Sequence, residues 1–279
     1  MAGACVWILA SRPEPTGAIN PPADPVGYEP SMIRDGRTEV AMVTGVLPLE
    51  EGAREIDYVH RLPKDLNRIE REALYEYLRS AEVSPYTHWV KNDIMNALRN
   101  QAEPPPELTD VLLELFYDRD QDIVVRVYAL QHLRPWYRMQ NQRDPRIIMA
   151  FFDALKEVDS EVAGAALLAL RYLSKDLAGI NTSEIAQEAV KLMQNPDANI
   201  LNRVSAMQVA SMLNGKNGDA SPYLDYAAPG NGVTVRAAAI AAIGASGDYS
   251  AQGVLVDYQE EGGPVAVAAA AALKKMNMK

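Results

Sequence analysis

The segments 122-DIVVRVYALQHL-133 and 231-NGVTVRAAAIAAIGASGD-248 repeat one arrangement of apolar residues, and this arrangement decides the fold class. Successive apolar positions are four, one and three residues apart, which places them on one face of an α-helix. The register fits six times between residues 90 and 273, at intervals of 35, 37, 40, 33 and 30 residues. Only Asn202 breaks its 24 apolar positions, although the whole chain is only 48% apolar. Its second position carries small residues in most copies: Ile94, Ala129, Ala166, Ala206, Ala239 and Ala269.

An interval of this length is typical of a solenoid whose repeats contain two helices each. A second amphipathic segment precedes each copy, so that each unit reads helix, short turn, helix. We therefore predict an all-α fold, an α-solenoid of about six two-helix repeats. A helix from Asp65 to Leu78 pairs with Tyr86–Asn100 in the first repeat. The later first helices are predicted at Glu107–Tyr117, Pro145–Lys156, Glu184–Gln194, Pro222–Ala228 and Ser250–Gln259.

Short polar residues stand where these helices are expected to begin. Their side chains can accept hydrogen bonds from the first free N–H groups of a helix. We expect this role for Asp122, Asp144, Asp159, Asn181, Asp197 and Asn231.

The segments that contain 122–133, 159–170 and 231–248 resemble HEAT repeats, in which an acidic residue is followed by Val-Arg and then by small and aliphatic residues. The resemblance covers roughly residues 65–276 and implies a right-handed superhelix. It also implies a ladder of Asp–Arg pairs between repeats, which Asp122 and Arg126 fit. Ala163 and Ala266 depart from that pattern.

Composition narrows the classes of partner. The chain has a formal net charge of −10 and a pI of about 4.9, which argues against nucleic acid and anionic membrane surfaces as partners. The single cysteine, Cys5, allows no intrachain disulfide and no cysteine metal cluster. No stretch reaches the roughly 18 apolar residues of a membrane span.

The first 64 residues are divided into two parts. Residues 1–30 combine the apolar start Ala2–Ala10 with a proline-rich run that is expected to be a disordered linker. The start is either the end of an export segment, which would place the protein outside the cytoplasm or anchored in the envelope, or a short leader of a cytoplasmic protein. Residues 31–64 form an extension in which Thr38–Leu49 suggests a strand or extended arm and Arg54–Arg61 a helical turn. Residues 65–279 are the predicted repeat domain.

The sequence predicts no catalytic residue, no cofactor and no metal site. His132 lies between Leu130 and Leu133 on a repeat helix, which favours a partly buried structural histidine. Residues 118–122 resemble the opening of a calcium loop, but Ile123 stands where that loop needs glycine. We therefore interpret them as a solvated turn.

Aromatic residues gather between residues 75 and 172, and the run 134-RPWYRMQNQR-143 combines them with arginines. We expect this run to follow a repeat helix, so that its side chains project beyond the stacked helices. Arg, Trp and Tyr are the residues that dominate binding hot spots. The resemblance and this cluster predict a non-enzymatic protein–protein interaction scaffold with an unidentified protein partner. The candidate contacts are Arg134, Trp136, Tyr137 and Arg138. The alternative is a HEAT-like enzyme that resembles phycobilin lyases or, less well given the acidic pI, alkylpurine DNA glycosylases.

Overall fold

A computed structural model of the chain describes residues 36–46, 48, 50–80, 86–177, 179–213 and 218–277. The expected linker, residues 1–30, lies outside the described residues, as does Cys5. Residues 35–279 form one compact unit.

The described residues are all-α, with fourteen α-helices and no strand. No helix among them is long and apolar enough to cross a membrane. Two helices precede the repeats, α1 (Gly36–Val43) and α2 (Glu55–Val59). The first helices of the pairs are α3 (Arg68–Arg79), α5 (Leu108–Tyr117), α7 (Pro145–Ala154), α9 (Thr182–Gln194), α11 (Ser221–Ala227) and α13 (Gln252–Glu260), the last preceded by the 3-10 turn Tyr249–Ala251. The second helices are α4 (Thr87–Arg99), α6 (Ile123–Met139), α8 (Val162–Asp176), α10 (Ile200–Leu213), α12 (Val233–Ser246) and α14 (Gly263–Asn277).

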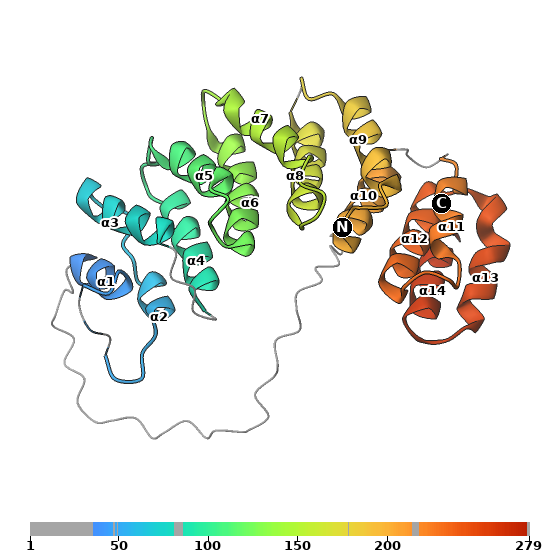
Figure 1. The fold of residues 1–279 in the computed structure, drawn as a ribbon, viewed down its shortest axis with the longest axis horizontal. Helices are drawn as coiled ribbons and strands as arrows, with labels where there is room; N and C mark the ends of the chain where they lie inside the picture. The colour runs from blue at the N-terminus through green and yellow to red at the C-terminus, as the bar shows by residue number, and fades with distance from the viewer. Residues whose placement is uncertain are drawn as a thin grey trace. The chain divides into compact units, whose positions relative to one another are not determined.

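Helices pack on their neighbours in chain order (Figure 1). Each first helix contacts its own second helix, and each second helix contacts the next one, from α4 to α14. Helix α2 continues this row by packing on α4, and α1 packs on both α2 and α3. The even-numbered helices from α2 to α14 therefore form an unbroken series of neighbours, which we call the second-helix row.

The repeat register forms the core of this row. The small residues at its second position, Ala129, Ala166, Ala206, Ala239 and Ala269, are all fully buried, as predicted. All but two of the 24 register positions are buried. The exceptions, Ala270 and Leu273, lie on α14, which no later described helix covers. Alanine at this position lets neighbouring helices approach closely and so sets the stacking distance.

Asn202, the polar exception in the register, is fully buried and links two repeats. Its Nδ2 donates to Val158 O at 2.9 Å and to Ser160 O at 2.5 Å, and its Oδ1 accepts from Gly164 N at 2.8 Å. A Cβ on Gly164 would lie 2.9 Å from that Oδ1. The amide satisfies three backbone groups that the packing buries, which explains why a polar residue is tolerated here.

Buried cations at the start of the register join three of the repeats to the repeat that follows. Lys91, Arg126 and Arg236 each donate to a backbone carbonyl at the end of the preceding first helix, where a positive charge is favourable. These carbonyls belong to Ser80, Phe116 and Ala227. Each cation also reaches an acceptor in the following repeat, and these acceptors are Gln121, Glu157 and Glu261. The expected Asp122–Arg126 pair is therefore wrong, because Arg126 pairs with Glu157.

Three of the six predicted helix starts are confirmed: the side chains of Asp122, Asp144 and Asn181 accept hydrogen bonds from the first turns of α6, α7 and α9. The other three are wrong. Helix α8 follows Glu161 instead of Asp159, Asn199 instead of Asp197 accepts from Leu201 N, and Asn231 donates to backbone carbonyls before α12.

The described part of the extension contains two helices, α1 and α2. The prediction of a strand or extended arm over residues 38–49 is wrong for residues 38–43, which belong to α1. Val40 and Val43, three residues apart, are both buried on one side of that helix. The helical turn predicted at residues 54–61 is present as α2.

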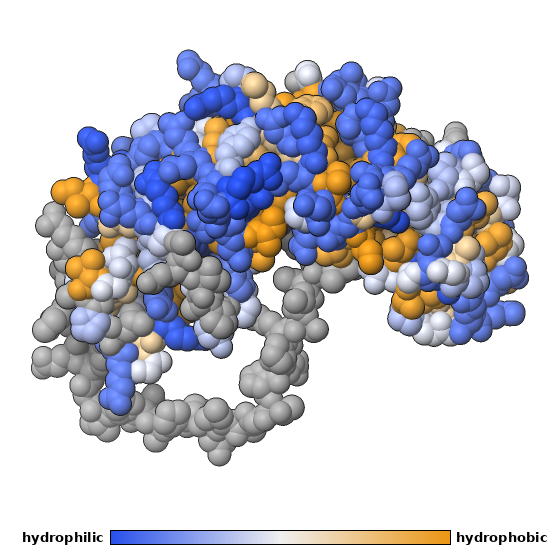
Figure 2. Space-filling model, viewed as in Figure 1, coloured by the Kyte–Doolittle hydropathy of each residue, from blue (hydrophilic) through white to orange (hydrophobic). Residues whose placement is uncertain are grey.

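Charged side chains join neighbouring first helices at the surface. Figure 2 shows hydrophilic residues over most of the visible face formed by α3, α5 and α7. Three ion pairs cross between these helices: Arg71–Glu107, Arg79–Glu114 and Arg146–Asp110. These ion pairs therefore join α3 to α5 and α5 to α7 at the surface of the first helices.

Candidate functional site

The predicted contact residues lie on the C-terminal half of α6, and one of them is not at the surface. Trp136 is only 4% exposed, and its Nε1 donates to Thr109 Oγ1 at 2.8 Å. The expectation that this side chain projects outward is wrong, because α6 continues past Leu133 and Trp136 extends its buried face. Trp136 is a core residue that fastens α6 to α5.

The other three residues stand nearer the surface and tie α6 to its neighbours. The Arg134 guanidinium lies 5.1 Å from the centroid of the Tyr172 ring, and Arg138 lies 3.2 Å from Asp176, both on α8. Tyr137 is half-buried against the core, with the Arg143 guanidinium 6.0 Å from its ring. Arg134 and Arg138 thus link α6 to α8, and Tyr137 contacts the segment that follows α6.

A continuous polar network lies beside this edge, on α4 and α6. His60, which follows α2, places Nε2 at 3.0 Å from Asp93 Oδ2, and Asn92 Nδ2 donates to Asp93 Oδ1 at 3.2 Å. His132 Nε2 in turn lies 3.0 Å from Asn92 Oδ1. The hydrogen bonds therefore connect an exposed histidine to a buried one through Asn92 and Asp93.

The network continues through an arginine. Arg99 Nη1 lies 3.3 Å from His132 Nδ1, and Arg99 Nη2 donates to Asn96 Oδ1 at 3.0 Å. Because the guanidinium can only donate, Nδ1 of His132 must be the unprotonated nitrogen and Nε2 must carry the hydrogen. His132 is more deeply buried than the partly buried histidine that was predicted, with only 4% of it exposed.

The electrostatic setting keeps His132 neutral. Burial lowers its pKa to about 3, and the positive charge of Arg99 acts in the same direction. Burial also raises the pKa of Tyr128, and the negative charge of Asp93 adds to that shift. The second-helix surface here is thus hydrogen-bonded and only partly solvated.

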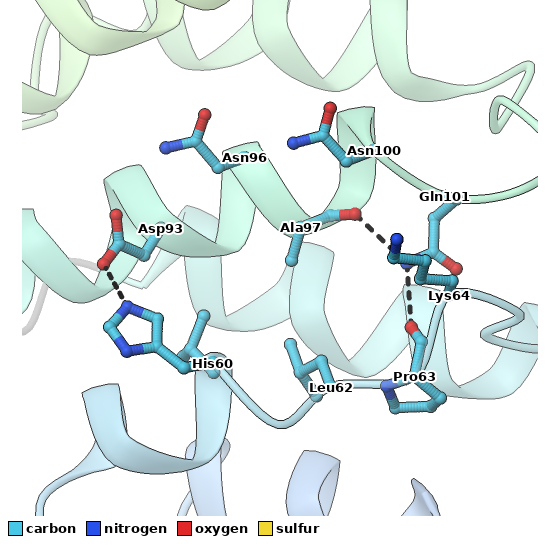
Figure 3. A pocket seen from close by; sticks show the side chains of 10 residues that line it. His60, Leu62, Pro63, Lys64, Asp93, Asn96, Ala97, Asn100 and Gln101 are labelled. Atoms are coloured by element: carbon cyan, nitrogen blue, oxygen red, sulfur yellow. Dashed lines mark hydrogen bonds and ion pairs between the residues drawn. The ribbon is translucent and has the colours of Figure 1, made fainter.

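A cleft of about 310 Å³ opens next to this network (Figure 3). One side is the segment from Val59 to Lys64, and the other is the face of α4 that carries Asp93, Asn96 and Asn100. Asn96 and Asn100 are one helical turn apart, and their amides point in the same direction in Figure 3.

The segment that walls the cleft is fastened to the end of α4. Gln101 Oε1 accepts from Leu66 N at 2.8 Å, and its Nε2 donates to Pro63 O at 3.1 Å. Ala102 N donates to Lys64 O at 2.7 Å. These bonds fix the position of His60 and Lys64 opposite α4, although they are distant from it in sequence.

Two exposed aromatic residues stand at the other end of α4. Trp89 is 48% exposed, and its ring centroid lies 5.5 Å from that of Tyr86. Residues 89, 93, 96 and 100 share one side of the helix by its periodicity. The aromatic pair and the cleft therefore lie on the same face of α4.

Sequence reasoning did not single out Asn92, Asp93, Asn96 or Asn100. The available signal was the polar side of the helix opposite the apolar register, where asparagines recur at every fourth position from Asn92 to Asn100. No group of three or more potential metal ligands is present among the described residues. No Ser, Thr or Cys is among the described residues that line the cleft. The site can therefore bind polar groups, but it does not pair His60 with a hydroxyl or thiol nucleophile.

No family model matches the chain, and neither a curated protein nor a solved structure is significantly similar to it.

Proposed function

We propose that this chain is a non-enzymatic protein–protein interaction scaffold, an α-solenoid of HEAT-like repeats whose partner binds along the second-helix row. The observation that carries the proposal is the fixed polar surface of α4, α6 and α8. Its side chains bond across helix boundaries, from His60 to Asp93, from Asn92 to His132 and from Arg138 to Asp176. A surface that is ordered before binding loses less conformational entropy when a partner docks.

The remaining candidate contacts fit this surface. Arg134 and Arg138 face α8 at the edge of the same row, and both are already oriented by neighbours. Partner contact through Arg134, Tyr137 and Arg138 remains part of the proposal, whereas Trp136 would act only by supporting α6.

An enzyme built on the same repeats is less well supported. Catalysis by the His60–Asp93 pair would need a nucleophile or a bound group nearby. The described lining of the cleft offers amides, a lysine and apolar side chains instead.

Site-specific photo-crosslinking in the native host tests the scaffold proposal. Gln131 is exposed on α6 in the second-helix row, and Gln187 is an equally exposed glutamine on the first helix α9. A photoreactive residue at position 131 should trap one protein saturably, and the same residue at position 187 should not. Equal labelling at both positions, or no discrete protein at position 131, would contradict the proposal.

A further inference from the structure

The α4 cleft has more free hydrogen-bond donors than free acceptors. Within the described residues, no partner occupies the Lys64 ammonium or the side-chain nitrogens of Asn96 and Asn100. Asn100 Oδ1 has no partner among the described residues, but Asp93 already accepts from His60 and Asn92. Asn96 Oδ1 likewise accepts from Arg99.

An acceptor-rich, negatively charged group complements such a set of donors. A carboxylate has two oxygens that accept only, and hydrogen bonds from an ammonium to a carboxylate are stronger than neutral ones. Backbone carbonyls without a hydrogen-bond donor at the C-terminal end of α4 would disfavour a bound anion. Gln101 Nε2 donates to Ala97 O at 3.1 Å, which covers one of them.

The other end of the same face offers an apolar anchor point. Trp89 is about half exposed, and it is the residue type that most often dominates recognition. Asn100 follows Trp89 by eleven positions, so the helical rise separates them by about 16 Å. An extended peptide covers that distance in about five residues.

We propose that this face of α4 binds an extended segment of a partner protein that carries an apolar side chain against Trp89 and an acidic side chain against Lys64. The two side chains lie about five residues apart along the segment. This inference rests on the proposed scaffold function and specifies the chemistry of the partner.

Fluorescein-labelled peptides test the inference with the full chain. One series carries a single Phe and a single Glu in a Gly-Ser background, and the number of residues between them increases in steps of one. Fluorescence anisotropy should give the tightest binding near a spacing of five residues. Replacement of Glu by Gln in the best peptide should weaken it about tenfold or more.

Two variants show which residue of the protein contacts the Glu and which contacts the Phe of the peptide. Lys64→Gln should abolish the preference for Glu over Gln while the dependence on Phe remains. Trp89→Ala should abolish the dependence on Phe while the preference for Glu remains. Lys275→Gln, an exposed lysine on α14, is the matched control and should change neither. Because all three side chains are exposed, melting temperatures should stay the same.

Other outcomes would overturn the inference. Equal binding of Glu, Gln and Lys peptides would remove the acidic specificity, and tighter binding of Lys peptides would indicate a basic partner held by Asp93. No binding tighter than about 1 mM at any spacing would remove the peptide site altogether. A protein still trapped at position 131 would then leave the scaffold proposal standing without this partner chemistry.

Discussion

Arg126 and Glu157 form a buried ion pair between successive repeats, with Arg126 Nη2 at 2.9 Å from both carboxylate oxygens. Their side chains are only 5% and 8% exposed. Arg126 Nε also donates to Phe116 O at 2.8 Å, and Arg119 Nη1 approaches Glu157 at 2.5 Å. One carboxylate thus joins α6, the end of α5 and the turn before α8.

Removal of that carboxylate should weaken the stacking of repeats. We expect Glu157→Gln to reduce the free energy of unfolding by about 3 kcal/mol, because the Arg126 charge would stay buried without its partner. Urea denaturation measures the change. Arg138→Gln, which breaks the more exposed Arg138–Asp176 pair, is the control and should cost less than about 1 kcal/mol. Equal losses in the two variants would mean that the buried pair contributes no more than a surface pair.

Gly244 marks the closest approach of α12 to α14. A Cβ at this position would lie 2.5 Å from Ala272 Cβ and 2.6 Å from Ala272 Cα, so the backbone of α14 would have to move. We expect Gly244→Ala to destabilise the protein by about 2 kcal/mol or more. Gly253→Ala on α13 meets open space and should stabilise by about 0.5–1 kcal/mol through helix propensity. A thermal melt in which both variants shift the same way would contradict this packing.

Ala166 tests the register in the middle of the row. The residue is fully buried between stacked helices, so Ala166→Leu should overpack the interface and cost about 1–3 kcal/mol. Ala241→Leu makes the same change at an exposed position of α12 and should leave the denaturation midpoint nearly unchanged. A midpoint for Ala166→Leu equal to that of the unaltered protein would indicate a different stacking.

The helical pairs could be predicted because apolar periodicity is a local property of the sequence. The same signal would have placed Trp136 correctly, since it follows the register residue Leu133 by three positions on an uninterrupted helix. The error came from ending that helix too early. Residues 38–49 were predicted to form a strand or extended arm, but within residues 38–43 the side chains of Val40 and Val43 are buried three residues apart on one side of a helix.

The site was less accessible to prediction because it depends on contacts between distant segments. His60 and Asp93 are 33 positions apart, and they meet because Gln101 fastens the segment after α2 to the end of α4. The partner of Arg126 was equally hard to predict. The nearby Asp122 caps α6, whereas the distant Glu157 forms the ion pair with Arg126. Which acidic residue pairs with a given basic one depends on the path of the turns between helices, and the helical period does not predict that path.

His132 should make stability depend on pH. Its pKa is lowered to about 3 in the folded protein from an ordinary value of 6.5, so between these values the unfolded chain binds more protons. The contribution of the neutral His132 to the free energy of unfolding is therefore fully present above pH 6.5 and is lost progressively as the pH falls toward 3. His132→Gln should flatten the pH dependence between 6.5 and 5, where few carboxylates titrate, by an amount on the order of 1–2 kcal/mol. Urea titrations at matched pH values would show parallel curves for both proteins if His132 were not responsible.

The two tryptophans of the described residues should separate stability from recognition. Trp136→Ala removes a buried ring and its hydrogen bond to Thr109, and we expect a loss of about 3–5 kcal/mol in the free energy of unfolding. Trp89→Ala removes a ring that is half exposed, so its cost in stability should be below about 1 kcal/mol. Partner capture by the position-131 crosslinker, measured well below each melting temperature, should persist for Trp136→Ala and fall for Trp89→Ala. Loss of capture for Trp136→Ala alone would indicate that Trp136 contacts the partner. That outcome would require α6 to open before the partner binds.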